Sequence, residues 1–387
     1  MKSDRLQVAL VGAAGQAAGH CHLNALPAVP RVDLAAVCDV DTAAVERIGR
    51  QHRISKVYSD YSKLLGDSQI DAVDLVVPPF LHAEMAIAAA RAGKHVYVEK
   101  PMARSLGEGC SMVAAAQQAR VKLMVGESYW FHGPHVLARR LIDDGEIGDV
   151  VQVRMTKDIW VFTDKENERL GGRGHDTTWR FDSDLSGGGD FPFFMDHGSH
   201  LFATARLLAG GQDIAWVTAL PRDHGYGGEK HLRGITAVSW AYVGGEADGV
   251  WTQVETPPEA GRYIGFRSEV TGTCGSMLIF GEGGGSALGF PQVMPVTVYR
   301  NGQIFEHDPN EGLDRTWQSN NNYYDQAHIN TLTEFVSAIL DDRPLSYDGH
   351  SGLLDLSTTL AVLRSATEMR PIQPSDVADD WRPKKHT

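Results

Sequence analysis

The chain has 387 residues, of which 42% are hydrophobic and 22% are charged. This length predicts two or three domains, and the composition excludes disordered, collagen-like and disulfide-scaffold proteins. With 36 basic residues against 49 acidic ones, the formal charge of -13 disfavours nucleic acid and anionic lipid as partners of the protein body.

Short apolar runs alternate with helical stretches over the first part of the chain. The predicted strands are 6–11, 34–38, 72–77, 95–98 and 121–125. The clearest helix is 82–92, which is rich in alanine and is followed by Gly93 at the position of a C-terminal cap. Strand, helix and strand with short connections predict a doubly wound parallel sheet, a Rossmann domain at residues 1–126.

The pattern of predicted elements changes after residue 126, where strands follow one another with few helices between them. The predicted strands are 150–155, 214–220, 235–243, 250–254, 267–271 and 277–280. This pattern predicts an α+β domain at residues 127–387 on an open, mostly antiparallel sheet. We expect one or both late helices, 330–341 and 352–367, to pack back on the first domain.

The loop after the first strand is typical of a dinucleotide site. Gly12, Ala14, Gly15 and Gln16 stand where small residues let backbone N–H groups approach a pyrophosphate at a helix N-terminus. Ala14 replaces the second glycine of the usual pattern, so a plain strand-to-helix turn is the alternative. Asp39 ends the second strand, where a carboxylate can accept both ribose hydroxyls. Because it would repel a 2′-phosphate, NAD is predicted over NADP.

Glu99, Lys100 and Pro101 follow the fourth strand. A lysine at the carboxyl edge of a parallel sheet lies in the crevice where such sheets bind ligands. The alternative is an ordinary surface Glu-Lys pair at a strand end.

Asp196 and His200 would lie one turn apart if the stretch from 196 to 208 is helical. Taking a proton from a secondary alcohol needs a base that titrates near neutrality, and a histidine beside a carboxylate supplies one. A helix-face pair with no chemistry is the alternative, with His197 as another partner for the aspartate.

Other features are weaker. His20 and His22 could suggest metal ligands, but no third ligand is evident, so we predict a helix-surface pair and no metal site. The four cysteines lack C-x-x-C spacing, and there is neither a signal core nor an apolar run long enough to span a membrane, so we expect a cytoplasmic protein with no membrane partner. The stretch 160–179 is either a sugar-binding lid or a set of scattered aromatics, and Tyr324 is a candidate for the substrate pocket.

Together these motifs resemble the glucose–fructose oxidoreductase, inositol dehydrogenase and rhizopine-catabolism family, abbreviated Gfo/Idh/MocA. The resemblance also takes in the segment from Pro78 to His82, the triple glycine at 187–189, and Trp179 with Arg180. Ala203 departs from the family, because many members carry a further aspartate there.

The resemblance implies the following roles. The catalytic residues would be Lys100, Asp196 and His200; the cofactor-binding residues Gly12, Ala14, Gly15, Gln16, Asp39, Pro78, His82, Glu99, Lys100 and Arg180; and the substrate-binding residues Lys100, Trp179, Asp196, His200 and Tyr324.

The implied reaction is reversible hydride transfer between NAD and a secondary hydroxyl of a sugar, polyol or inositol-like substrate. The alternative is an NAD-dependent glycosidase that works by transient oxidation, elimination and re-reduction, with no net NADH. A silent NAD-binding sensor is disfavoured because Lys100, Asp196 and His200 are all present. A homodimer or homotetramer is expected by family analogy.

Overall fold

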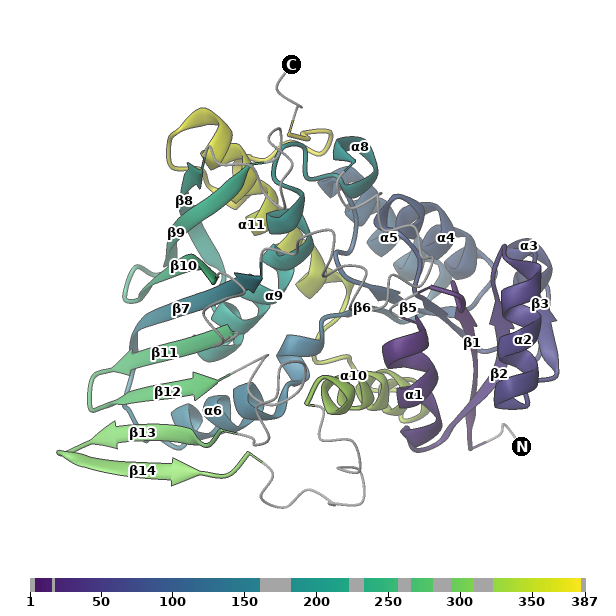
Figure 1. Ribbon diagram of the computed structural model, residues 1–387, viewed down its shortest axis with the longest axis horizontal. Coiled ribbons are helices and arrows are strands. Elements are labelled where there is room, and N and C mark those ends of the chain that lie inside the picture. Colours follow the sequence, from purple (N-terminus) through teal and green to yellow (C-terminus); the bar gives the residue numbers. More distant parts are fainter. Residues whose placement is uncertain are drawn as a thin grey trace.

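The computed structural model describes residues 4–15, 18–160, 182–222, 233–256, 266–280, 294–309 and 323–383. It contains a six-stranded sheet and an eight-stranded sheet, side by side with helices between them (Figure 1). The predicted fold class is confirmed: a doubly wound parallel sheet is joined to an α+β part built on a mostly antiparallel sheet.

All strand pairs of the first sheet are parallel, in the order β3-β2-β1-β4-β5-β6. The strands are β1 Leu6–Val11, β2 Val32–Cys38, β3 Lys56–Tyr58, β4 Ala72–Leu75, β5 His95–Glu99 and β6 Leu123–Gly126. The strand order reverses at β1, which pairs with both β2 and β4. The carboxyl ends of strands on either side of such a reversal form the crevice where open α/β sheets bind ligands.

Short polar caps and turn residues set the bounds of the helices around this sheet. The helical segments are η1 Ala18–His22, α1 Leu23–Ala25, η2 Leu26–Ala28, α2 Thr42–His52, α3 Tyr61–Leu65, α4 Pro79–Arg91 and α5 Leu106–Ala119. Helix α4 begins three residues before the predicted start, because Pro79 occupies the first turn, where its missing N–H costs nothing. Gly93 follows the helix with φ 74°, as predicted for the residue after a helix end.

The second sheet has the order β14-β13-β12-β11-β7-β10-β9-β8. Its strands are β7 Val150–Trp160, β8 Ile214–Arg222, β9 Gly234–Tyr242, β10 Asp248–Thr256, β11 Phe266–Gly272, β12 Ser276–Phe280, β13 Val296–Arg300 and β14 Gln303–His307. Every pair is antiparallel except β7 with β10. The predicted strands are present, and the hairpin of β13 and β14 was missed.

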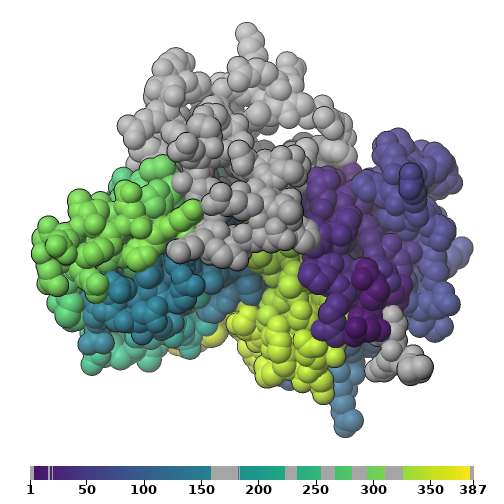
Figure 2. Space-filling view, turned by 90° about the horizontal axis from the view of Figure 1, so that it is seen from below, coloured from purple at the N-terminus to yellow at the C-terminus, as the bar shows by residue number. Residues whose placement is uncertain are grey.

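Helices join the two sheets. The remaining helical segments are η3 Ser128–Phe131, α6 Gly133–Asp143, α8 Ser183–Ser186, α9 Pro192–Leu208, α10 Tyr323–Leu340, α11 Gly349–Glu368 and η7 Pro374–Asp376. Helix α10 contacts α1 and β6, while α11 contacts α9, β8 and β6. In Figure 2 the yellow-green α10 segment lies between the purple first domain and the teal and green second one.

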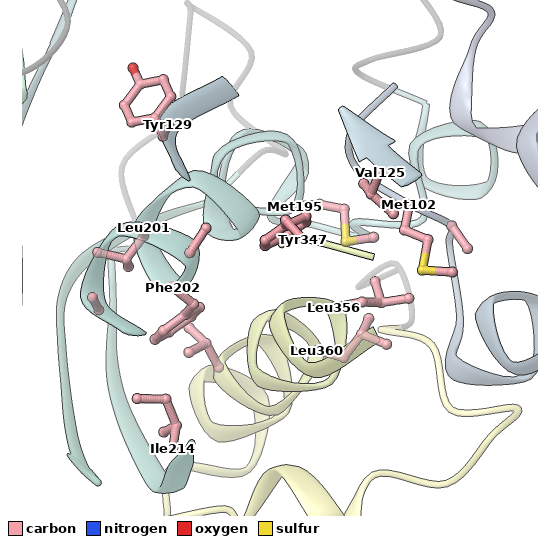
Figure 3. Close-up of a cluster of buried hydrophobic side chains, with 14 of the residues drawn as sticks. Met102, Val125, Tyr129, Met195, Leu201, Phe202, Ile214, Tyr347, Leu356 and Leu360 are labelled. Carbon is pink, nitrogen blue, oxygen red and sulfur yellow. The ribbon is translucent and has the colours of Figure 1, made fainter. Parts of the chain in front are cut away.

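One continuous core therefore spans both parts of the chain. Figure 3 shows Met102 and Val125 of the first part beside Leu356 and Leu360 of α11, with Phe202 of α9 on the other side of that helix. All five side chains are buried. Because burial of each such side chain contributes about 1.5–3 kcal/mol, this core holds the two sheets in a fixed relation. Among the helices that the structure describes, none combines the length and apolar character needed to cross a membrane.

Candidate active site

The loop that follows β1 is shaped for a close approach to the end of β4. Gly12 has φ 78°, and a Cβ atom there would lie 2.2 Å from the backbone oxygen of Val76, so a side chain cannot be accommodated. The N–H of Ala14 donates to Oδ2 of Asp39 at 2.9 Å. A half-buried carboxylate at the end of β2 can accept hydrogen bonds from ribose hydroxyls, and a glycine turn that leads into a helix can offer N–H donors to a pyrophosphate.

Lys100 follows β5 and reaches the second part of the chain. Its Nζ atom donates to both the backbone oxygen and Oδ1 of Asp196, each at 3.2 Å. The side chains of Lys100 and Asp196 are 13% and 16% exposed. Helix α9 thus presents Asp196 to a lysine from the other domain, and the pair lies at the carboxyl edge of the parallel sheet.

His200 lies one turn further along α9 and is bound by a residue that the sequence did not single out. Its Nδ1 atom lies 2.5 Å from Oε1 of Glu127, the residue directly after β6. The ring of Tyr129 stacks on the imidazole, with centroids 4.1 Å apart. Asp196 was predicted to orient His200, but the described contacts give that role to Glu127 and pair Asp196 with Lys100. The reason is topological, because α9 contacts residues that follow both β5 and β6.

Glu127 is an unusual carboxyl group. It is fully buried, and this burial raises its pKa to about 7, although the positive charge of Lys100 acts in the opposite direction. A carboxyl group that titrates near neutrality and is bound to an imidazole can change the basicity of that ring within the physiological pH range. With Nδ1 held by Glu127, Nε2 is the ring atom suited to exchange a proton with a substrate.

A small pocket lies beside His200. It is lined by Lys157, Phe194, His197, His200, Leu201, Trp251 and Phe266. Burial lowers the pKa of His197 well below its usual range, with Lys157 adding to the effect, so this ring is neutral. His197 also stacks on Phe193, with ring centroids 4.1 Å apart, which gives it a packing role in α9.

His22 forms a buried ionic cluster with two strand residues. Its Nδ1 atom lies 2.7 Å from Asp74 of β4, and its Nε2 atom lies 3.1 Å from Glu99 of β5. The predicted helix-surface position is wrong for His22, which has 0% exposure, because these carboxylates draw it into the sheet. Burial alone would lower the pKa of His22, but Asp74 and Glu99 outweigh it and raise the pKa to about 10.

The same cluster includes a set of side chains that could hold a metal ion. One donor atom each of His22, Glu99 and His328 lies within 4.8 Å of the others. The protonated His22 already compensates the charge of Glu99 in this arrangement. The absence of a metal therefore stays a prediction from the sequence.

Replacing His22 with glutamine is expected to lower the free energy of unfolding by about 3–5 kcal/mol at pH 7, because it leaves buried carboxylates without their cation. Since the folded pKa of about 10 exceeds the ordinary 6.5, the stabilisation is fully present below pH 6.5 and is lost as the pH rises through 10. Urea unfolding at pH 6.5, 8 and 10 measures this. The wild type should lose stability relative to H22Q over that range, while H52Q, at an exposed histidine, should follow the wild type. A constant difference would contradict the assignment of charge to His22.

The remaining predicted residues are placed as follows. Pro78 precedes α4 as its N-terminal flanking residue. His82 is fully buried, with its ring nitrogens 3.0 and 2.8 Å from the backbone oxygens of Pro101 and Val77, so its described contacts fix the loop after β5 and do not point to a cofactor. Gln16, Trp179 and Arg180 lie outside the described residues, as does the side chain of Tyr324 in α10.

The first sheet is of the type that binds dinucleotides. It meets the second sheet at Lys100, Asp196, Glu127 and His200. This arrangement is typical of two-domain proteins that depend on a dinucleotide. The family described as "Oxidoreductase family, NAD-binding Rossmann fold" (GFO_IDH_MocA) matches residues 6–127, and the "GFO/IDH/MocA C-terminal domain" matches residues 135–278. The chain belongs to the GFO/IDH/MocA oxidoreductase family.

Two curated relatives and one solved structure show what this chain is similar to. Levoglucosan dehydrogenase of Pseudarthrobacter phenanthrenivorans is 32% identical over 184 residues, which cover 48% of this chain and 44% of that protein. The scyllo-inositol 2-dehydrogenase (NAD(+)) of Bacillus subtilis is 36% identical over 131 residues, or 34% of this chain and 38% of that protein. The chain thus spans about half or less of the length of these curated relatives. A structure of levoglucosan dehydrogenase with NADH and levoglucosan has a TM-score of 0.76 at 23% identity, with 95% and 99% of the two chains covered, and shows a shared fold.

Proposed function

We propose that this protein is an NAD-dependent oxidoreductase that transfers a hydride between the nicotinamide and a secondary hydroxyl of a sugar, polyol or inositol-like substrate. The observation that carries the proposal is the meeting of two pairs at the junction of the sheets: Lys100 with Asp196, and Glu127 with His200. One pair offers a cation and the other a buried base, which are the two groups that alcohol oxidation needs.

The proposed roles follow from the contacts. His200 takes the hydroxyl proton on Nε2, while Glu127 holds Nδ1 and stabilises the imidazolium that forms. The ammonium of Lys100 stabilises the negative charge that develops on the substrate oxygen, and Asp196 fixes the position of that ammonium. The nicotinamide, when bound, supplies the hydride acceptor.

Residues 1–126 supply the proposed cofactor site. Gly12, Ala14 and Gly15 would face the pyrophosphate, and Asp39 would accept the ribose hydroxyls. The carboxylate of Asp39 supports NAD over NADP, since it would repel a 2′-phosphate. One curated relative is called a scyllo-inositol 2-dehydrogenase (NAD(+)) and another a D-xylose 1-dehydrogenase (NADP(+)), so both cofactors belong in the test.

An absorbance screen at 340 nm tests the reaction. A panel of sugars, inositols and glycosides is incubated with NAD+ and with NADP+ in parallel, and aglycone release is measured on the same plate. We expect NADH to accumulate with at least one sugar or polyol and to exceed NADPH. Aglycone release without net NADH would favour the redox-neutral glycosidase, and NAD binding with no turnover anywhere on the panel would favour a sensor.

We also propose that the chain assembles as a homodimer or homotetramer in the cytoplasm. The second sheet exposes large apolar side chains, among them Trp216, Leu220 and Tyr299, and such groups on an open sheet favour a protein partner. Sedimentation velocity is expected to give two or four times the chain mass, and Trp216→Glu is expected to shift the mass toward the monomer. A monomeric wild type at micromolar concentration would contradict this. None of the four cysteines forms a disulfide, as suits a reducing compartment.

A further inference from the structure

The turn after β6 contacts the imidazole of His200 in two different ways. Glu127 meets its edge at Nδ1, and Tyr129 of the same turn lies against its face, with ring centroids 4.1 Å apart and 23° between the ring planes. Both Tyr129 and His200 are buried, with 3% and 4% exposure. A hydrogen bond at the edge leaves a ring able to rotate about that bond. A second contact at the face fixes the plane of the imidazole as well.

The backbone of Tyr129 is held on both sides of its Cα atom. Its N–H donates to Oε1 of Glu127 at 3.1 Å, which is the same oxygen that bonds His200. Its carbonyl oxygen accepts a hydrogen bond from Nδ1 of His135, in the first turn of α6, at 2.9 Å. His135 is fully buried, and this burial lowers its pKa to about 4, so the ring is neutral and Nδ1 carries the proton. Tyr129 is therefore fixed relative to both Glu127 and α6.

Other elements support the same turn. Asn330 of α10 donates from Nδ2 to the carbonyl oxygen of Phe131 at 3.0 Å. Phe266 of β11 meets the Tyr129 ring edge-on, with centroids 5.4 Å apart. Figure 3 shows Tyr129 beside α9, the helix that carries Leu201. The turn thus joins β6, α10 and the second sheet, and it holds the Tyr129 ring rigidly against His200.

An aromatic face attracts an imidazolium more strongly than a neutral imidazole, because the face of the ring carries negative charge density. In the proposed reaction His200 changes from the neutral form to the cation. An interaction that strengthens as the reaction proceeds lowers its barrier, whereas one that stays constant does not. The Lys157 ammonium lies 5.9 Å from the centroid of the same Tyr129 ring, so the imidazole is the nearer group.

We propose that Tyr129 is a positioning residue for the proton transfer: its ring holds the plane of the His200 imidazole so that Nε2 faces the substrate hydroxyl, and it stabilises the imidazolium that forms. This inference rests on the proposed oxidoreductase function, because Tyr129 acts through His200. The O–H bond of the substrate breaks and the Nε2–H bond forms, while no bond of Tyr129 changes.

Kinetics of ring variants test the proposal. Steady-state rates are measured with NAD+ and the best compound from the absorbance screen for wild type, Y129F, Y129L and Y129M; the flexible methionine is included so that one aliphatic variant folds. Y129L and Y129M are expected to lower kcat about tenfold, with KM changed by less than about twofold. Y129F keeps the aromatic face and should retain the wild-type kcat. A tenfold loss in Y129F would overturn the proposal.

F335L is the matched control for the loss of a buried ring. Phe335 of α10 is 1% exposed and packs edge-on against Tyr97, with centroids 5.7 Å apart. F335L should lower the unfolding temperature about as much as Y129L does, but it should keep the wild-type kcat. A loss of kcat in F335L equal to that in Y129L would assign both effects to general destabilisation and overturn the proposal.

The H200A background shows whether Tyr129 acts through His200. Adding Y129L to H200A should change the residual rate by less than about twofold, because the group on which the ring acts is already gone. A further tenfold loss in this background would contradict the positioning role.

NMR of the imidazoles needs no turnover and separates the two proposals. The protein is labelled with 13C-histidine, and the His200 resonance is assigned as the one missing from H200Q. Because an aromatic face shields the nuclei above it, the Cε1–H resonance of His200 should move downfield in Y129L and stay in place in Y129F and F335L. An unmoved resonance in Y129L would overturn the inference. A moved resonance with wild-type kcat in Y129L would overturn the positioning role and leave the function standing. A moved resonance with no NADH from any compound would overturn the proposed function while the contact stands.

Discussion

Replacing Lys100 with alanine is expected to lower turnover by about 100-fold or more and to leave the dissociation constant of NAD+ nearly unchanged. In the proposed mechanism the ammonium acts on the substrate oxygen, where charge develops during the reaction, and its described partner is Asp196 on α9. His200→Ala should have an effect of similar size, because it removes the proposed proton acceptor. Steady-state rates at 340 nm and fluorescence titration with NAD+ measure the two quantities.

The double variant sharpens this prediction. If both groups act on one hydroxyl, neither works well alone. The double variant should therefore lose much less turnover than the product of the fold-losses of the two single variants. Lys63→Ala is the control, because Lys63 is an exposed lysine of α3, and its turnover should equal that of the wild type. A double variant with full activity would remove Lys100 and His200 from the mechanism.

Glu127→Gln is expected to lower the rate of alcohol oxidation by about 100-fold and to change its pH profile. Burial raises the pKa of Glu127 to about 7, so the carboxylate form exists above that pH and is lost as the pH falls through it. Because Glu127 and His200 share a hydrogen bond, their protons come off as a pair, and the extra proton below pH 7 leaves the imidazole unable to accept another. Wild-type oxidation should therefore decline below about pH 7.

In E127Q that decline near pH 7 should disappear or move, because glutamine can still accept a hydrogen bond but cannot ionise. Measuring kcat/KM from pH 5.5 to 9 for both proteins tests this. Glu334→Gln, which alters an ion pair with Arg343 in another part of the molecule, should keep the wild-type profile. An E127Q profile identical to that of the wild type would contradict the assignment of the pH dependence to Glu127.

The architecture could be predicted because local sequence patterns indicate its strands and helices. Apolar runs of strand length and short connections with helices between them leave few topologies other than a doubly wound sheet. The hairpin of β13 and β14 has a local sequence signal, the pair Asn301-Gly302, which the prediction did not include. Both residues have positive φ, 51° and 72°, as a two-residue hairpin turn requires. Its strands are five residues each, and β14 is mostly exposed, so their apolar pattern is weak.

The residues of the site were predictable where a strand end or a helical spacing indicates them. Lys100 and Asp39 were found because polar residues after parallel strands face the crevice, and the same rule applied to β6 would have found Glu127. The pairing of Asp196 with Lys100 and of Glu127 with His200 depends on how α9 packs against the ends of the parallel strands. No local pattern in the sequence encodes this packing. His22 shows the same limit, since its burial depends on Asp74 and Glu99 from distant strands.

The proposed hydride transfer, from the carbon whose hydroxyl His200 would deprotonate, is tested most directly with a labelled substrate. The best compound from the absorbance screen is deuterated at the reacting carbon and incubated with NAD+, and the NADH is weighed by mass spectrometry. The expected result is a single deuterium in the NADH and none in the solvent. Unlabelled NADH, or deuterium found in water, would contradict direct transfer at this site.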